Sequence, residues 1–263
     1  MMDIRNTKGR LLNTLESWKE GFIEVDDKGE QHWEPGYSAH SLGLFFTKGE
    51  GKKWLDGLVR SILGCPIKYT AAEIEHESKL DTYRGKHRMQ DLAVWGTCPD
   101  GRTVFVGIEA KVLEPFGNYS VRDEYEAALL YKQKVNPRSR KPNRVEDIVT
   151  ELFPGKSPYD EPVCNLRYQL MHYLLGSLNE GADIVESKKS LKERRRADIV
   201  IMPVLVFDTP HYRTDEEKAK RNRQDFEDFR IANGFSDRDG CFFKQYGDQQ
   251  VFMAYNTVTL PSQ

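Results

Sequence analysis

The chain has 263 residues, of which 38% are hydrophobic and 11% aromatic, enough to bury a substantial core in one large domain or two small ones. No run of about 18 apolar residues is present, and the first twenty residues lack the apolar core of a signal peptide, so we expect a cytoplasmic globular protein without a membrane partner. The 39 basic and 41 acidic residues nearly cancel, so the total charge says nothing about a polyanionic partner.

The first half of the chain predicts a helix followed by three strands. Apolar side chains recur at helical spacing over residues 48–63, and "GCP" ends this helix. Strands are expected at 66–80, 88–96 and 103–112. The "CPDG" turn between the last two is typical of a hairpin, so those strands should pair antiparallel and bring Asp91 near Glu109.

The second half predicts alternating helices and strands. Helices are expected at 121–134, near 144–153 and within 163–178, followed by a strand at 197–207 that is apolar on both faces and therefore buried. A charged helix at 215–234 and a short hairpin around 245–256 complete the chain. We interpret the whole as one domain over 1–263, with an insertion at about 113–163 and a C-terminal helix-hairpin extension from about 210.

Three basic runs interrupt this near-neutral chain, at 132–144, 188–196 and 218–223. Such runs are usually solvated, but they also supply the phosphate contacts of nucleic-acid-binding proteins. The residues that we expect to bind nucleic acid are Lys132, Lys134, Arg138, Arg140, Lys141, Arg194, Arg195 and Arg196. If the partner is a duplex, the first two runs should flank the acidic site described below.

Two charged residues share one face of the strand at 103–112. Side chains of a strand alternate between its faces, so Glu109 and Lys111 point the same way, opposite to the apolar face. A strand that is wet on one side and carries an exposed ion pair would show the same pattern. The strand therefore needs its neighbours for an interpretation.

The order of elements around these charges resembles the PD-(D/E)XK nuclease superfamily, the fold of many restriction enzymes and recombination nucleases. The matching segments are "QDLAVWG", which contains Asp91, and "IEAK", which contains Glu109 and Lys111; the proline that often precedes the aspartate is Gln90 here. Residues 90–210 also look like a family of uncharacterised bacterial nuclease-like proteins that share "EAKV", "FG" and "RYQLLH" segments. The resemblance implies an α/β, restriction-endonuclease-like core with a mixed central sheet flanked by helices.

A third acid is expected from the first helix. Glu50 stands four residues before Trp54 on the apolar face, so it should point toward the sheet. Members of the superfamily commonly supply a metal-binding acid from this helix, whereas a first-turn glutamate favoured by the helix dipole is the alternative. Glu75 and Glu77 share one strand face and compete for the role, with Glu77 as the reserve.

Gln169 and Tyr173 form a QxxxY pair inside an apolar helix, and their i,i+4 spacing puts them on one face. A similar pair accompanies the active site in the RecB-like exonuclease branch of the superfamily. The resemblance therefore adds both residues to the catalytic set, which we expect to open onto the same pocket. A glutamine at the edge of a buried helix is the alternative.

These residue types permit metal-assisted phosphodiester hydrolysis. Mg²⁺, for which Mn²⁺ may substitute, prefers oxygen ligands, so Asp91, Glu109, the Ala110 carbonyl and Glu50 are the expected metal ligands. Lys111 would orient the attacking water and offset charge on phosphorus. We expect a DNase of bacterial defence or DNA processing. An RNA-cleaving enzyme and an inert binding module of the same fold remain alternatives, and a homodimer or partner subunit stays open.

Other chemistries find no motif. The sequence contains no P-loop, no GxGxxG after a strand, no G-x-S-x-G elbow and no HExxH. The four cysteines are widely separated, without a CxxC pair, so neither a zinc knuckle nor a disulfide framework is expected.

Overall fold

The computed structural model describes residues 2–25, 33–85 and 87–260. Its strands are β1 (Ile4–Asn6), β2 (Lys68–Ser78), β3 (Arg88–Thr97), β4 (Thr103–Lys111), β5 (Ile199–Asp208), β6 (Ser236–Arg238), β7 (Cys241–Tyr246) and β8 (Gln249–Thr259). Its helices are α1 (Leu15–Ile23), α2 (Ser38–Thr47), α3 (Glu50–Leu63), α4 (Val121–Lys134), α5 (Lys141–Leu152), α6 (Tyr168–Leu178), α7 (Ile184–Lys188) and α8 (Glu216–Ala232), with short 3₁₀ turns at Val163–Asn165 and Tyr212–Thr214.

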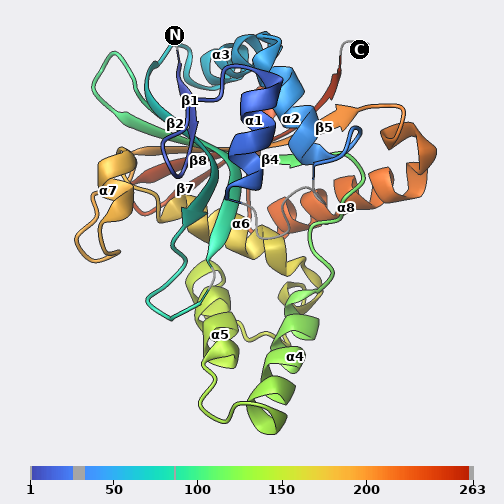
Figure 1. Ribbon diagram of the computed structural model, residues 1–263. Coiled ribbons are helices and arrows are strands. Elements are labelled where there is room, and N and C mark those ends of the chain that lie inside the picture. Colours follow the sequence, from blue (N-terminus) through green and yellow to red (C-terminus); the bar gives the residue numbers. More distant parts are fainter. Residues whose placement is uncertain (1, 26–32, 86, 261–263) are drawn as a thin grey trace.

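The strands form one mixed sheet in the order β1-β2-β3-β4-β5-β8-β7-β6. Neighbours β2, β3 and β4 are antiparallel, β4, β5 and β8 are parallel, and β8, β7 and β6 are antiparallel again. Helices α1 to α3 cover one face and α6 crosses the other (Figure 1). The predicted α/β class, a mixed central sheet flanked by helices, is confirmed.

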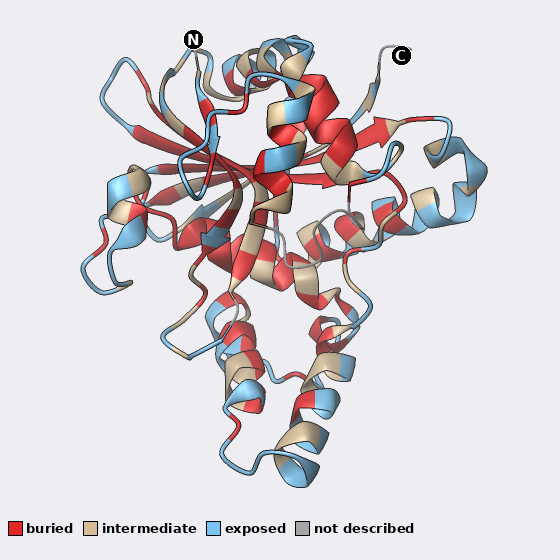
Figure 2. Cartoon of the chain, viewed as in Figure 1, coloured by how far each residue is buried: buried red, intermediate tan, exposed pale blue. Residues whose placement is uncertain are grey.

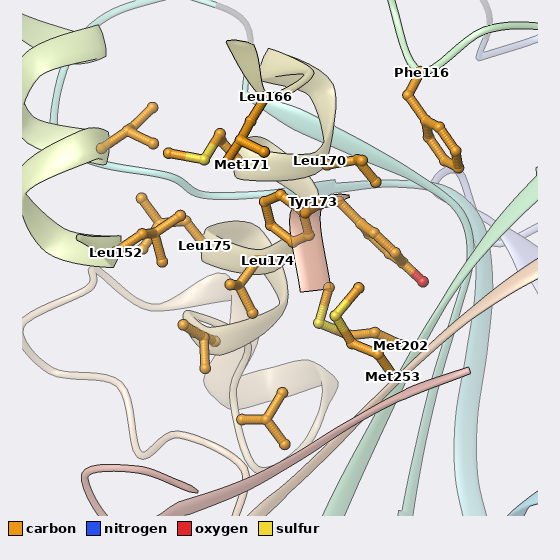
Figure 3. Close-up of a cluster of buried hydrophobic side chains, with 14 of the residues drawn as sticks. Phe116, Leu152, Leu166, Leu170, Met171, Tyr173, Leu174, Leu175, Met202 and Met253 are labelled. Carbon is orange, nitrogen blue, oxygen red and sulfur yellow. The ribbon is translucent and has the colours of Figure 1, made fainter. Parts of the chain in front are cut away.

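The central strands are buried on both faces, as Figure 2 shows in red. Every residue of β4 is buried, because α1 to α3 pack on one face and α6 on the other. Leu170, Met171 and Leu174 of α6 pack against Met202 of β5 and Met253 of β8 in the core between α6 and the sheet (Figure 3). Strands enclosed in this way have no wet face, so the charges on β4 are not an exposed ion pair.

The β3–β4 hairpin has the predicted antiparallel pairing. Leu92 lies opposite Ile108, and Thr97 lies opposite Thr103 next to the turn. The turn closes with a hydrogen bond from the Cys98 amide to the Arg102 carbonyl, and Gly101 adopts φ +89°, which an L side chain rarely adopts. Continued by one residue, this register puts Asp91 at the level of Glu109, as the turn signal predicted.

The segment predicted as an insertion contains α4 and α5, which lie side by side and project from the body as an arm (Figure 1). Helix α5 begins at Lys141, three residues before the predicted start, with proline in its first turn. Val145, Ile148 and Val149 pack it against the α6 core, whereas the outer surface of the arm is exposed (Figure 2).

The C-terminal helix and hairpin are present, but the expectation of an extension is wrong for β8. Strand β8 pairs in parallel with β5 over its whole length and lies inside the sheet. Its residues Val251 to Ala254 are buried, so removing it would expose the flank of β5. No helix in the described ranges is long and apolar enough to cross a membrane.

Candidate functional site

Strands β2 and β3 break their regular alternation at the same level, and an acid stands at each break. Leu92 packs on the α1–α3 side, whereas Gln90, two residues earlier, donates to Ser177 of α6 on the other side. Asp91 lies between them. On the neighbouring strand β2, Glu75 lies at the level of Asp91, and its φ of +48° is rare for a residue with a side chain. Both acids are half-buried and belong to neither core cluster.

Both acids line a pocket of about 390 Å³ at the end of β4. Lys111 and Glu114 complete its charged wall. The opposite wall consists of apolar side chains of α1 and α2, and the first turn of α2 closes it. Three carboxylates and one amine therefore share one concave site, the arrangement that a ligand carrying positive charge or a bound cation would stabilise.

Glu109 does not line this pocket; its carboxylate lies behind Lys111, on the α6 side, and is held by three side chains. The Lys111 Nζ lies 2.9 Å from its Oε1, and the Gln169 Nε2 donates to the same oxygen at 3.1 Å. Arg88 forms an ion pair with Oε2. Glu109 is only 2% exposed, so these partners replace the water that an ionised carboxylate would otherwise require.

Asp91 is tied to the backbone of β4. Its Oδ2 accepts from the Ala110 amide at 2.7 Å, in place of a β3 carbonyl, at the point where the two strands separate. The amide and carbonyl of one strand residue point toward the same neighbour, so the Ala110 carbonyl faces this gap too. Burial raises the pKa of Asp91 and lowers the pKa of Lys111, because each charged form loses its hydration.

The two residues of the QxxxY pair have different roles. Gln169 contacts the carboxylate of Glu109. Tyr173 is instead 1% exposed, and its hydroxyl lies between two carbonyls that share its one hydrogen, Gly107 at 2.6 Å and Pro203 at 3.0 Å (Figure 3). Tyr173 therefore fastens α6 to β4 and β5, and its hydroxyl does not open onto the pocket.

The expectation for Glu50 is wrong. It is the first residue of α3, exposed and paired with Lys53 at 2.9 Å, and it does not line the pocket. The buried stripe of α3 contains Gly51, Leu55 and Val59, so Glu50 stands one position away from it. Of the two strand acids, the structure places Glu75 in the pocket, whereas Glu77 is exposed and accepts from the His87 amide.

Sequence reasoning missed Glu114 and Arg88. The Glu114 carboxylate accepts from the amides of Val112 at 2.6 Å and Ser38 at 2.8 Å, so it holds the start of α2 against the end of β4. Arg88 is 8% exposed, with its guanidinium 5.7 Å from the centre of the Tyr173 ring. An arginine inside the predicted strand at 88–96 was the available signal, since a buried guanidinium requires a carboxylate partner.

The predicted role of Arg194 is wrong as well. Its guanidinium is buried and donates to the carbonyls of Asn179, Ser187 and Lys189. Arg194 therefore fixes the loop after α7 and is not available to phosphate. Its neighbours Arg195 and Arg196 are exposed.

The run at 132–144 does not flank the pocket. The loop between α4 and α5 forms the far tip of the arm, well apart from α1 and α2, which border the pocket (Figure 1). Arg140 lies over the Tyr83 ring at 5.2 Å, and Lys141 lies over the Tyr131 ring at 4.3 Å. Lys132, Lys134 and Arg138 belong to the tip of the arm, away from the carboxylates of the pocket.

As far as the structure describes the chain, no three His, Cys, Asp or Glu side chains form a group that could hold a metal ion. A family model matches residues 11–259, and its description reads "Domain of unknown function (DUF6946)". No curated protein and no solved structure matches the chain.

Proposed function

Because the chain belongs to this family, whose description assigns no activity, we propose from the site alone that it is a Mg²⁺-dependent nuclease that hydrolyses phosphodiester bonds of DNA. One observation carries the proposal: Lys111 and Asp91 line one pocket at the open end of the β3–β4 hairpin, and Lys111 is paired there with the buried Glu109 behind it. An ion pair with a purely structural role would gain little from a pocket that contains further carboxylates.

The donor atoms fit the proposed metal. Mg²⁺ takes oxygen ligands, keeps several waters and is commonly held by one or two carboxylates together with substrate phosphate, so a preformed cluster of three side chains is not required. Asp91 and Glu109 would hold it, with the Ala110 carbonyl, and Glu75 replaces Glu50 as the third acid. When bound, the ion would lower the pKa of water and neutralise phosphate charge.

The chain's own residues divide the remaining work. The Lys111 amine stands where it can orient the attacking water and offset the charge that develops on phosphorus. Gln169 and Arg88 hold Glu109 from two sides, so its carboxylate keeps one orientation. The apolar wall from α1 and α2 limits the water that reaches these groups, which strengthens their electrostatic effect.

An RNA-cleaving enzyme would use the same residues, since the phosphodiester chemistry of a metal, carboxylates and an amine is the same in both nucleic acids. An inert binding module would keep the pocket without turnover. Incubating the purified chain with labelled single-stranded and duplex DNA and with RNA, in Mg²⁺ and in EDTA, separates these three possibilities. Cleavage of RNA alone would replace the DNase proposal, and absence of cleavage would favour the inert module.

We predict that Lys111→Met and Asp91→Asn each reduce the cleavage rate by at least about 100-fold, the scale of losing a catalytic acid–base or electrostatic group. Glu50→Gln is the matched control, because this exposed acid lies outside the pocket. It should retain the wild-type rate. Circular dichroism and thermal unfolding of all three variants separate loss of chemistry from loss of fold. Cleavage that survives both pocket substitutions would refute the proposed site.

A further inference from the structure

The carboxyl ends of the parallel strands β4, β5 and β8 meet along one edge of the sheet. The register places Lys111 of β4 beside Val206 of β5, and Asp208 of β5 beside Thr259 of β8. In open α/β sheets this edge is where ligands bind, because loops leave it and strand ends present polar backbone groups. The candidate catalytic pocket occupies only the β4 part of the edge.

Two further pockets continue along the same edge. The second, of about 570 Å³, lies between the start of α2 and the ends of β5 and β8. The third, of about 670 Å³, lies between β5, β8 and α8. The Tyr37 ring of the catalytic pocket lies 5.1 Å from the His211 ring of the second pocket, and Asp208 and Arg213 line both the second and the third. We call the second and third pockets, together with the Tyr37–His211 ring pair that joins them to the catalytic pocket, the edge groove.

The edge groove combines aromatic rings with cations. Tyr37 is 41% exposed and His211 is exposed, so this ring pair presents a face to solvent. Tyr212 and Tyr255 line the third pocket. Rings spaced along a groove stack on successive bases without reading their sequence, because every base has a π face.

The cations of the edge groove are Arg213, Lys220 and Arg223. Lys220 and Arg223 belong to the basic run at 218–223, for which the catalytic site itself has no use. Arg213 pairs with Asp208 and Arg223 with Glu227, but both arginines are exposed, and such pairs contribute little and exchange readily for phosphate.

The depth of the catalytic pocket favours single-stranded over double-stranded nucleic acid as the ligand. Lys111, which lines the pocket, is 6% exposed, and its partner Glu109 behind it is 2% exposed, so a scissile phosphate must enter the pocket to approach this pair. A duplex holds its phosphates on the outside of a wide, stiff cylinder, whereas a single strand can bend its backbone into a recess and turn its bases onto the rings.

We propose that the edge groove binds single-stranded nucleic acid and leads one phosphodiester into the catalytic pocket. The Tyr37–His211 ring pair is the point at which the strand would pass from the groove to that pocket. This deepens the proposed nuclease function and rests on it for the cleavage step. The binding step stands on the groove alone.

The test uses the full chain and fluorescein-labelled dT₁₂, with a 12-base-pair duplex of the same label for comparison. Fluorescence anisotropy is measured in Ca²⁺ at two salt concentrations. Tyr37→Ala should weaken dT₁₂ binding by about five- to 150-fold, the effect of losing one base stack. Arg213→Ala/Lys220→Ala should lower the salt slope by about 1.4, the value for two single-strand phosphate contacts. Lys134→Ala/Arg138→Ala removes the same residue types from the tip of the arm and should leave both quantities unchanged.

The edge groove proposal is overturned if the groove variants bind dT₁₂ like the wild type, if the arm control weakens binding equally, or if the duplex binds more tightly than dT₁₂. Hydrolysis of bis(4-nitrophenyl) phosphate, a diester too small to reach the groove, is measured in Mg²⁺ in parallel. Wild-type protein that binds dT₁₂ through the groove but hydrolyses neither dT₁₂ nor this diester would refute the nuclease and support the groove. Wild-type protein that hydrolyses the diester while groove variants cut dT₁₂ at the wild-type rate would refute the groove and support the nuclease.

Discussion

Removing the hydroxyl of Tyr173 tests whether this residue of the QxxxY pair has a structural role, whereas Gln169 contacts the carboxylate of Glu109. Tyr173→Phe deletes the one buried hydrogen bond that the hydroxyl shares between the carbonyls of Gly107 and Pro203, and keeps the ring in the α6 core. This bond contributes about 1 kcal/mol net, so the free energy of unfolding should fall by about that amount. For a chain of this size that lowers Tm by about 2–4 °C.

The assay combines urea unfolding with the cleavage rate of the folded protein at a temperature well below both transitions. Tyr173→Phe should lose stability and keep its rate, whereas Gln169→Ala should lose rate, because Glu109 is then free to reorient. Tyr119→Phe is the control for stability, since this tyrosine is 51% exposed, and it should change unfolding by less than about 0.5 kcal/mol. Unchanged stability of Tyr173→Phe together with a fall in its rate would show that the hydroxyl serves the chemistry and would refute the assigned role.

Two further predictions concern buried charges away from the pocket. Burial alone would lower the pKa of His76, but Glu180 and Glu73 outweigh it and raise that pKa from 6.5 to about 9. The resulting stabilisation is complete below pH 6.5 and is lost as the pH rises through 9, so the urea midpoint should fall over this range, and His76→Asn should fall less. Arg194→Ala leaves the buried carbonyls of Asn179 and Ser187 without their donor and should cost about 3 kcal/mol of unfolding free energy, with nucleic-acid affinity unchanged. A loss of affinity without loss of stability would restore its predicted role.

The sequence by itself determined the hairpin and what it brings together. Strand parity and a four-residue turn are local properties, so they place Asp91 beside β4 at the level of Glu109 without reference to the rest of the chain. The i,i+4 spacing likewise fixed which face Gln169 shares with Tyr173. The apolar stretches within 197–207 and 163–178 were sufficient to predict a buried strand and a buried helix.

Only the tertiary structure decided which additional charges reach those residues. The buried stripe of α3 begins at Gly51, one residue after Glu50, so Glu50 faces solvent. Glu75, where the backbone of β2 has a positive φ, lines the pocket in its place. Arg194 looks like a surface cation in sequence, yet backbone carbonyls bind it. The place of Arg88 inside a strand indicates a carboxylate partner but does not identify it as Glu109. Such partners are distant along the chain, and a side chain's charge does not encode which of them it will meet. Local periodicity therefore predicted the core of the site, whereas packing between distant segments decided its edges.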